Sequence, residues 1–211
     1  MKLAICSDVH GNYRRLNEFR RRNLGIPSQD TYVLGDIVQW GTTFVENRCV
    51  NLVRTRGYNV VSGNHDQLTS LRRDIILHQG GIDIMDRKFY PENIDYLRGL
   101  PRKIKRDGVI FAHSLPIENQ MRIKNQQDAH SVFPLFDHEK IRIAFIGHNH
   151  CPFVFAYNPA TKQVIEISGG KVSLNPNLFY LVNPGTLGLG KTGSFILFDT
   201  SSKTVERKEL N

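Results

Sequence analysis

The sequence has few cysteines and lacks any long apolar run. Among its 211 residues are three cysteines, Cys6, Cys49 and Cys151, which lie far apart and form no CxxC pair. Such a set argues against a disulfide framework and against a cysteine zinc site. No run approaches the roughly 20 apolar residues that span a bilayer, and the first apolar stretch is too short for a signal peptide. We therefore expect a cytoplasmic protein without membrane contact, in which Cys151 is a buried structural thiol.

Acidic residues are the minority among the charged ones. The chain has 28 lysines and arginines against 20 aspartates and glutamates, which gives a formal net charge of +8. A basic surface favours anionic partners such as phosphate esters, nucleotides or nucleic acid. Part of the excess is one cluster made of Arg14, Arg15, Arg20, Arg21 and Arg22. We expect this cluster to form the solvated face of a helix, because no aromatics are interleaved to make a stacking platform for single strands.

The first half alternates short apolar runs with helical patterns. Strands are predicted at residues 2–7, 31–34 and 58–61, and helices at 12–23 and 43–56, with Gly57 ending the second helix. Residues 67–98 read as helices, and Pro91 opens the second of them. Strands that alternate with helices imply βαβ units and a mainly parallel sheet.

The second half is richer in strands. Residues 109–112 and 142–146 read as buried strands, and 154–157, 163–167, 179–182, 194–199 and 204–208 as antiparallel ones. The composition, 40% hydrophobic and 23% charged, is that of a globular protein. We predict one domain over residues 1–211, an α/β fold built as a four-layer α/β/β/α sandwich of two mixed sheets flanked by helices.

Five polar motifs each follow an apolar run that reads as a strand. They are Asp8-Val9-His10, Gly35-Asp36, Gly63-Asn64-His65-Asp66, His113 and Gly147-His148-Asn149-His150. Strand carboxyl ends form the ligand crevice of open α/β sheets, so five strands can deliver side chains to one place. Carboxylate, amide and imidazole groups suit divalent first-row metals.

The spacing inside the motifs also favours metal binding. In an extended segment, Asp8 and His10 point to the same side, as do His148 and His150, because the side-chain period is two. The two oxygens of Asp36 allow it to bridge two metals. Each motif alone has an ordinary alternative: a chance DxH, a turn at Gly35-Asp36, a turn with a helix cap at Asp66, or a strand-end histidine. Their joint occurrence in this order favours a metal site.

The order DxH, GD, GNHD, H and GHxH resembles that of the calcineurin-like metallophosphoesterase superfamily over essentially the whole chain. The short chain and Asn183-Pro184-Gly185-Thr186 look like its compact bacterial and archaeal phosphodiesterase branch. Two departures are mild: Thr186 stands where that branch often has serine, and Ser114 follows His113 where glycine is common. The resemblance implies one metal held by Asp8, His10, Asp36 and His150. It implies a second held by Asp36, Asn64, His113 and His148, with Asp36 bridging.

The resemblance also implies a function. Two divalent metals, with manganese as first choice and Fe, Ni, Co, Zn or Mg as alternatives, would serve hydrolysis of phosphodiesters or phosphomonoesters. His65 would not bind metal; with Asn64 it would face the substrate, contact the phosphate and donate a proton to the leaving oxygen. A nuclease or other nucleic-acid-processing enzyme is the alternative that the charge keeps open. A non-catalytic interaction scaffold is a third, although such a protein should have lost ligands and none is missing.

Residues 114–138 form a long polar stretch before a helix. They could form a lid or a substrate wall in which Met121, Arg122 and Lys124 meet the rest of a substrate, or simply a mobile loop. The other histidines, His78, His130 and His138, have no matching partners and are expected to be surface or packing residues.

Overall fold

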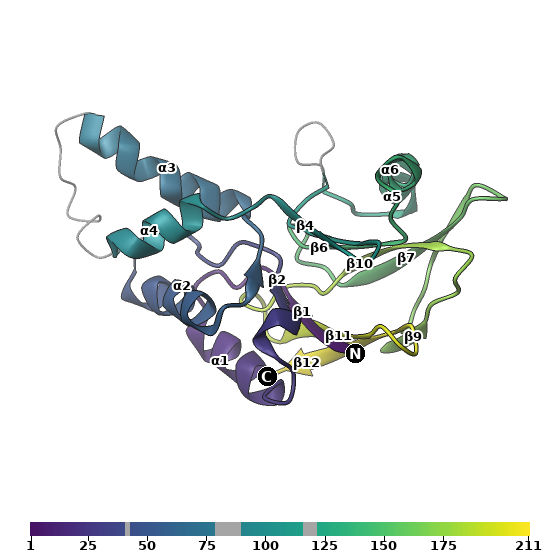
Figure 1. The fold of residues 1–211 in the computed structure, drawn as a ribbon, viewed down its shortest axis with the longest axis horizontal. Coiled ribbons are helices and arrows are strands. Elements are labelled where there is room, and N and C mark those ends of the chain that lie inside the picture. The colour runs from purple at the N-terminus through teal and green to yellow at the C-terminus, as the bar shows by residue number, and fades with distance from the viewer. Residues whose placement is uncertain (41–42, 79–89, 116–121) are drawn as a thin grey trace.

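Two six-stranded mixed sheets form the centre of the molecule (Figure 1). The structure is a computed structural model that describes residues 1–40, 43–78, 90–115 and 122–211, with the side chains of 72–78 left aside. The first sheet has the order β3-β2-β1-β11-β12-β9. Its strands are β1 (Lys2–Cys6), β2 (Thr31–Val33), β3 (Asn59–Val60), β9 (Lys171–Ser173), β11 (Gly193–Asp199) and β12 (Thr204–Leu210). Strands β1, β2 and β3 are parallel to one another, and β11 pairs antiparallel with β1.

The second sheet has the order β4-β5-β6-β10-β7-β8. Its strands are β4 (Lys103–Arg106), β5 (Val109–Ala112), β6 (Ile143–Ile146), β7 (Phe153–Asn158), β8 (Gln163–Glu166) and β10 (Phe179–Asn183). Strands β5, β6 and β10 run parallel to one another. Strand β4 pairs antiparallel with β5, β7 pairs antiparallel with β10, and β8 pairs antiparallel with β7. Each sheet therefore has a parallel part, and the motifs found in the sequence follow strands of these two parts.

Helices cover the outer faces of both sheets. Helices α1 (Tyr13–Arg22), α2 (Phe44–Arg56) and α4 (Pro91–Arg98) pack on the first sheet, and α5 (Gln126–Val132) and α6 (Pro134–Glu139) on the second. Helix α3 (Asn64–His78) packs against α4, and a short 3-10 turn, η1 (Ser28–Asp30), precedes β2. Figure 1 shows α1 and α2 on one side of the sheets and α5 and α6 on the other.

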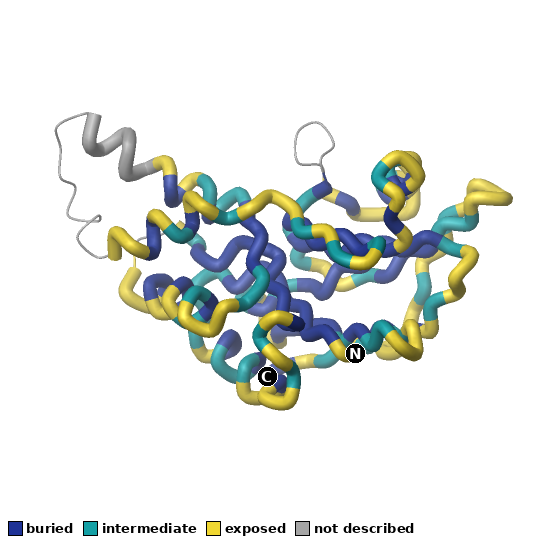
Figure 2. Tube along the Cα trace, viewed as in Figure 1, coloured by how far each residue is buried: buried dark blue, intermediate teal, exposed yellow. Residues whose placement is uncertain are grey.

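Three apolar layers hold these four layers of structure together. Along β1, Leu3 and Ile5 point to the core between the sheets, while Ala4 and Cys6 point to the core under α1 and α2. A third core joins α5 and α6 to the second sheet through Phe133 and its neighbours. Both faces of β1 are thus buried, and Figure 2 shows the central strands as the buried part of the chain. The predicted four-layer α/β/β/α sandwich is confirmed.

Most predicted elements are present, with informative differences. Pro91 opens α4 as expected, and Gly57 ends α2 in a left-handed conformation (φ 64°) that glycine adopts without steric cost. Strands β4 and β9 were not predicted. Both are short strands at sheet edges with charged, exposed positions, so they lack the apolar pattern on which the prediction depends.

Two further expectations were wrong. Cys151 is exposed rather than buried, whereas Cys6 and Cys49 are buried in the core under α1 and α2. Arg15 is buried rather than part of a solvated helix face, because its guanidinium faces the loop that leads into β11. No helix in the described ranges is both long and apolar enough to cross a membrane.

Candidate metal centre

All eight predicted site residues lie just after the carboxyl ends of parallel strands. Asp8 and His10 follow β1, Asp36 follows β2, and Asn64 and His65 follow β3 in the first sheet. In the second sheet His113 follows β5, and His148 and His150 follow β6. Because the parallel parts of the two sheets end at the same side of the sandwich, the loops converge. Seven of the eight side chains form two clusters of possible ligand atoms.

The first cluster consists of Asp8, His10, Asp36 and His150, whose ligand atoms all lie within 4.8 Å of one another. Asp8 Oδ1 lies 3.2 Å from His150 Nε2 and 3.8 Å from His10 Nε2. The two imidazole Nε2 atoms of His10 and His150 are 3.1 Å apart. One small cation could therefore contact all four groups.

The second cluster shares Asp36 with the first and adds His113, His148 and Asn64. His113 Nε2 lies 3.4 Å from Asp36 Oδ2, 3.1 Å from Asn64 Oδ1 and 3.2 Å from His148 Nδ1. His113 Nδ1 lies 2.7 Å from the Leu34 carbonyl, to which it must donate its proton. That hydrogen bond turns Nε2 of the same ring toward the cluster.

The ligand loops are not extended, so the reasoning from a side-chain period of two was wrong. Asp8, His10, Asp36, His148 and His150 all have positive φ, between 44° and 67°. For residues other than glycine each such conformation costs on the order of 1–3 kcal/mol. The side chains converge because the backbone turns sharply after each strand.

Backbone hydrogen bonds between loops hold these turns. The Asp8 and His10 amides donate to the carbonyls of Gly35 and Asp36, at 3.1 and 2.9 Å. The His148 amide donates to Asp8 Oδ2 at 3.1 Å, which links the two sheets through a ligand side chain. The strain is therefore spread over a network that fixes the loops relative to one another.

Asp36 is fixed in its position between the clusters. Its Oδ1 accepts a hydrogen bond of 2.9 Å from the His65 amide, which leaves Oδ2 directed at His10 and His113. Gly63 makes this possible, because a Cβ on that residue would lie only 2.1 Å from Asp36 Oδ1. A side chain at position 63 would therefore displace the shared carboxylate.

Protonation differs within the second cluster. Burial opposes the charged form of His113, but the hydrogen bond to Asp36 and the charges of Asp36 and Asp8 raise its pKa to about 9. Burial alone would raise the pKa of Asp36, yet the hydrogen bond with His113 and the positive charge of that ring hold it below its usual value. Burial and the charges of His113 and Arg122 lower the pKa of His148 to about 4. At neutral pH the His113–Asp36 pair thus carries one shared proton beside a neutral His148.

In the first cluster, His10 carries no proton comparable to the one on His113. Burial lowers the pKa of His10 despite the charges of Asp36 and Asp8, so the ring is neutral at pH 7. Asp8 Oδ1 is buried and has no hydrogen-bond partner among the described residues. A buried anionic oxygen without a donor, beside two imidazole nitrogens, is costly unless a cation binds there. The residues present therefore fit a divalent metal.

His65 belongs to neither cluster, but its ring lies over the first. Its centroid is 5.1 Å from that of His10, in an edge-to-face arrangement, and 5.1 Å from the ring of Trp40, which is half exposed. His65 Nδ1 donates a short hydrogen bond to the Gln39 carbonyl. Since Nδ1 is occupied in this way, Nε2 is the nitrogen that is left for a ligand.

A buried carboxylate orders the loop behind His65. Glu46 Oε1 accepts from the Gln39 and Trp40 amides at 2.7 and 2.8 Å, and Oε2 from the Thr43 amide at 2.8 Å. Glu46 is also the third residue of α2 and completes a capping box with Thr43. The sequence analysis missed this role, although the TxxE signature at the start of the helix was visible.

Asp66 joins the ends of β2 and β3. One of its carboxylate oxygens accepts from the Ile37 and Val38 amides, at 2.9 and 3.3 Å, and the other from the Gly63 amide, at 3.0 Å. Burial and the charge of Asp36 raise its pKa to about 6. Asp66 thus supports the loops that carry Asp36 and Asn64 without facing the clusters.

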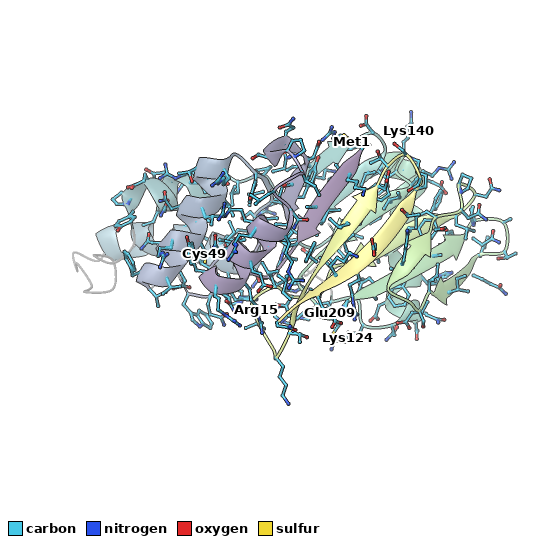
Figure 3. The ribbon with its side chains drawn as sticks, turned by 90° about the horizontal axis from the view of Figure 1, so that it is seen from below. Met1, Arg15, Cys49, Lys124, Lys140 and Glu209 are labelled. Atoms are coloured by element: carbon cyan, nitrogen blue, oxygen red, sulfur yellow. The ribbon has the colours of Figure 1, made fainter. Side chains whose placement is uncertain are left out.

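The Asn183-Pro184-Gly185-Thr186 motif also supports the ligand loops. Asn183 Nδ2 donates to the Gly147 carbonyl at 2.8 Å, and Thr186 Oγ1 donates to the Asp8 carbonyl at 2.9 Å. Arg15, labelled in Figure 3, lies where α1 meets the next loop and donates to the carbonyls of residues 187–191 at 2.6–3.4 Å. This buried arginine therefore ties α1 to the segment that packs behind the Asp8 loop.

The stretch predicted as a lid or wall is described only in part. Met121 lies outside the described residues, so nothing follows for it. Arg122 is exposed and its charge acts on His148, and the Asn149 side chain donates to the Ile123 carbonyl at 2.6 Å. Residues 122–123 therefore border the second cluster. Lys124 donates its amide to Asp128, and His130 packs edge-on against Tyr157.

The fold and the site define a two-sheet α/β protein with a candidate aspartate–histidine metal cluster at the strand ends. A profile of the calcineurin-like phosphoesterase superfamily domain matches residues 1–203, and the chain belongs to this superfamily. The resemblance seen in the motifs is thereby confirmed.

Individual relatives agree with this assignment. An uncharacterized protein of Methanocaldococcus jannaschii is 31% identical over 221 residues, which cover 97% of this chain and 85% of that protein. The crystal structure of a metallophosphoesterase from Sphaerobacter thermophilus matches with a TM-score of 0.79 and 25% identity, over 100% of this chain and 89% of the other. A structure described as a novel archaeal phosphodiesterase shares the fold, with a TM-score of 0.51, 13% identity and full coverage of both chains.

Proposed function

We propose that this protein hydrolyses phosphodiesters, phosphomonoesters or both at a centre of two divalent metals. The observation that carries the proposal is the pair of ligand clusters that share Asp36. Asp8, His10, Asp36 and His150 would hold one metal, and Asp36, Asn64, His113 and His148 the other. Manganese is the first choice, and Fe, Ni, Co, Zn or Mg suit the same oxygen and nitrogen ligands. We also propose that residues 1–211 act as one catalytic domain.

When bound, two divalent cations would neutralise phosphate charge and lower the pKa of the attacking water. The chain's own residues would do the rest. Asp36, held by the His65 amide, would keep the two sites at a fixed separation. Neutral His10 and His148 would bind without releasing protons, while His113 would release the proton that it shares with Asp36.

His65 would act on the leaving group. With Nδ1 donating to the Gln39 carbonyl, Nε2 can carry a proton toward the ester oxygen that departs. Asn64 would orient the phosphate beside this ring. The half-exposed Trp40 next to His65 could contact an apolar part of the leaving group.

A matrix of esters and metals tests the proposal. The panel contains a bis-aryl phosphate, an aryl monophosphate, cyclic nucleotides and single-stranded DNA, each with Mn, Ni, Co, Fe, Zn or Mg and each repeated with excess chelator. Metal content is measured on the same samples. We expect hydrolysis of at least one ester that rises with metal occupancy toward two per chain and is lost on chelation. If no ester is hydrolysed with any metal, although two metals are bound, the proposal is wrong and the interaction-scaffold alternative gains.

A further inference from the structure

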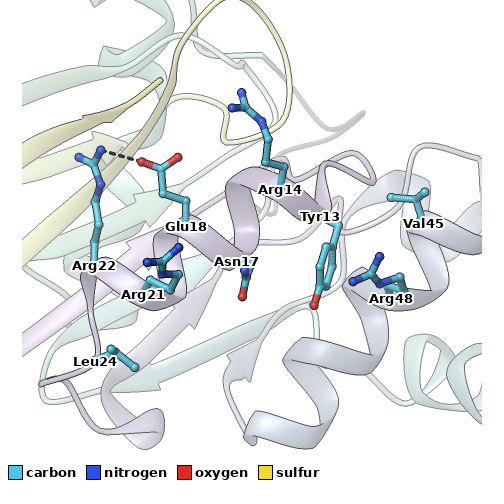
Figure 4. A pocket seen from close by; sticks show the side chains of 9 residues that line it. All are labelled: Tyr13, Arg14, Asn17, Glu18, Arg21, Arg22, Leu24, Val45 and Arg48. Carbon is cyan, nitrogen blue, oxygen red and sulfur yellow. Dashed lines mark hydrogen bonds and ion pairs between the residues drawn. The ribbon is translucent and has the colours of Figure 1, made fainter.

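A groove lined by arginines lies outside the candidate metal centre, between α1 and α2. A hollow of about 860 Å³ opens there, and a smaller one of about 300 Å³ continues from it; Tyr13, Asn17 and Arg48 line both. We call the two together the arginine groove. Figure 4 shows Tyr13 of α1 and Arg48 of α2 side by side where the two helices meet. The volume falls within the range of about 300–1,000 Å³ that is usual for ligand pockets.

The charge in this groove is almost entirely of one sign. Its walls hold one acidic residue, Glu18, and the arginines are Arg14, Arg20, Arg21, Arg22, Arg48 and Arg56. Glu18 is already paired with Arg22 at 2.6 Å, as the dashed line in Figure 4 marks. The groove therefore carries a large share of the net charge of +8 in a small area.

Three of these guanidinium groups have no polar partner within the part of the chain that the structure describes. Arg21, Arg48 and Arg56 are exposed and make no hydrogen bond or ion pair there, whereas Arg14, Arg20 and Arg22 each donate to a protein oxygen. Arginine is always charged and presents a planar fork of donors that matches phosphate oxygens. Three guanidinium groups without a hydrogen bond, spaced along the two parts of the groove, fit a ligand with several phosphates.

An aromatic contact distinguishes this groove from a simple basic patch. The Arg48 guanidinium lies over the Tyr13 ring, 3.9 Å from its centroid. Aromatic and arginine planes of this kind are the surfaces on which unpaired bases stack, with the backbone lying along basic side chains. In the sequence Tyr13 and Arg48 are far apart, so the absence of interleaved aromatics in the arginine cluster was misleading. The fold creates the pairing.

We propose that the arginine groove binds the sugar–phosphate backbone of a single-stranded nucleic acid. A flexible strand can follow a groove between two helices, and phosphates repeated along it can meet successive arginines. Tyr13 lies three residues after His10, so the groove begins close to the metal centre. The inference does not rest on hydrolysis and holds whether the strand is substrate or regulator.

Binding of a fluorescent single-stranded oligonucleotide, followed by polarisation over a range of salt concentrations, tests this inference. The measurement is made with excess chelator, so that metals take no part, and repeated with Mn²⁺. The test variant is Arg21→Gln/Arg48→Gln/Arg56→Gln, whose side chains support no described hydrogen bond. The matched control is Arg102→Gln/Lys162→Gln/Lys171→Gln, which removes the same charge from exposed positions outside the groove. Thermal unfolding checks that both variants fold normally.

We expect the groove variant to bind the strand at least tenfold more weakly at moderate salt. The slope of log binding constant against log salt concentration should be smaller by about 2, because each phosphate contact with a single strand contributes about 0.7 to that slope and three arginines are removed. The control variant should not show a comparable change in affinity or in salt slope. Equal losses in both variants would mean that only net charge matters, and would overturn the inference. So would tighter binding of duplex DNA, or displacement by poly-glutamate as effectively as by unlabelled strand. If inorganic polyphosphate displaces the labelled strand more effectively than unlabelled nucleic acid does, the inference is overturned and the groove is assigned to polyphosphate.

Discussion

The two ligand clusters that share Asp36 are built from the same residue types but differ in what balances their charge. In the second cluster a proton on His113 is bound beside Asp36, and the pKa of His113 is raised to about 9. In the first, burial lowers the pKa of His10, and Asp8 Oδ1 has no donor among the described residues. The charge of the second cluster is therefore balanced internally at neutral pH, whereas the first leaves a buried carboxylate oxygen without a donor, which fits a cation.

This difference comes from what the Nδ1 atom of one histidine in each cluster contacts. His113 follows a strand of the second sheet, and its Nδ1 reaches across to the Leu34 carbonyl of the first, which orients Nε2 toward Asp36. His10 Nδ1 is buried and finds no such acceptor in the described part of the chain. We therefore expect a metal at the second site to compete with a proton, and a metal at the first site to bind without that competition.

The largest effect should come from the residue that the clusters share. Asp36→Asn replaces the carboxylate that the two clusters share by a neutral amide, so under the proposed function both metal sites would lose a ligand. Activity should fall by more than the factor of about 10²–10⁴ that a single general acid supplies, and metal content should drop at both sites together. Elemental analysis and hydrolysis of an aryl ester measure the two quantities. A variant that keeps two metals per chain would show that Asp36 does not bridge.

A smaller loss, of about 10²–10⁴-fold in kcat, is expected for His65→Ala, because in the proposed mechanism this ring would transfer a proton and would not bind metal. Metal content should be unchanged, which separates His65 from its neighbour His10 in the first cluster. His10→Asn is the matched comparison, since it should lower occupancy of one metal. Parallel loss of metal and activity in His65→Ala would place His65 among the ligands. A leaving group of low pKa should rescue His65→Ala, since it needs no proton.

Glu46→Gln tests the support behind His65. A Gln side chain keeps one acceptor oxygen and replaces the other by an NH2 donor, so it cannot accept from the Gln39, Trp40 and Thr43 amides together, and the loop whose Gln39 carbonyl holds His65 should loosen. Changes in such supporting groups usually cost about 10–100-fold. We expect a loss in that range in kcat, with normal metal content and a pH profile shifted by the altered His65 environment. A loss of stability without any shift in the profile would reduce Glu46 to a helix cap.

The sequence was sufficient to predict the layers and the residues that gather at the strand ends, because each depends on local pattern. A buried strand followed by Asp, Asn or His is visible residue by residue, and the parallel order of these strands brings their ends together. The geometry of the loops was not visible. The positive φ of Asp8 and His10 is held by hydrogen bonds from their backbone amides to the carbonyls of Gly35 and Asp36, which lie more than 20 residues away.

The supporting residues were harder to find for the same reason. Arg15 sits in a run of arginines that looks solvated, and only the fold shows that its guanidinium meets the carbonyls of residues 187–191. Cys151 follows two candidate site residues, His148 and His150, yet the chain turns outward there and exposes the thiol. The pairing of Tyr13 with Arg48 likewise joins two helices that the sequence treats separately.

The smallest expected effect is a pH dependence that belongs to the second cluster alone. His113 has a pKa of about 9 in the folded chain against 6.5 ordinarily. A raised pKa stabilises the fold fully below pH 6.5, and this stability is lost as the pH rises through 9. In chelator, the Tm should therefore fall across this window. His148 and His10, with lowered pKa values, and Asp66, at about 6, make their contributions at lower pH.

Two comparisons isolate that effect. With saturating Mn²⁺ the fall in Tm between pH 6.5 and 9 should vanish, because the cation replaces the His113 proton in the folded chain, and apparent metal affinity should instead rise over the same window. His113→Gln should remove most of the fall in chelator, while His10→Gln should leave it in place, since His10 carries no such proton. A metal-free chain whose Tm is flat across this window would mean that no proton bridges His113 and Asp36. The two clusters would then differ only in their position.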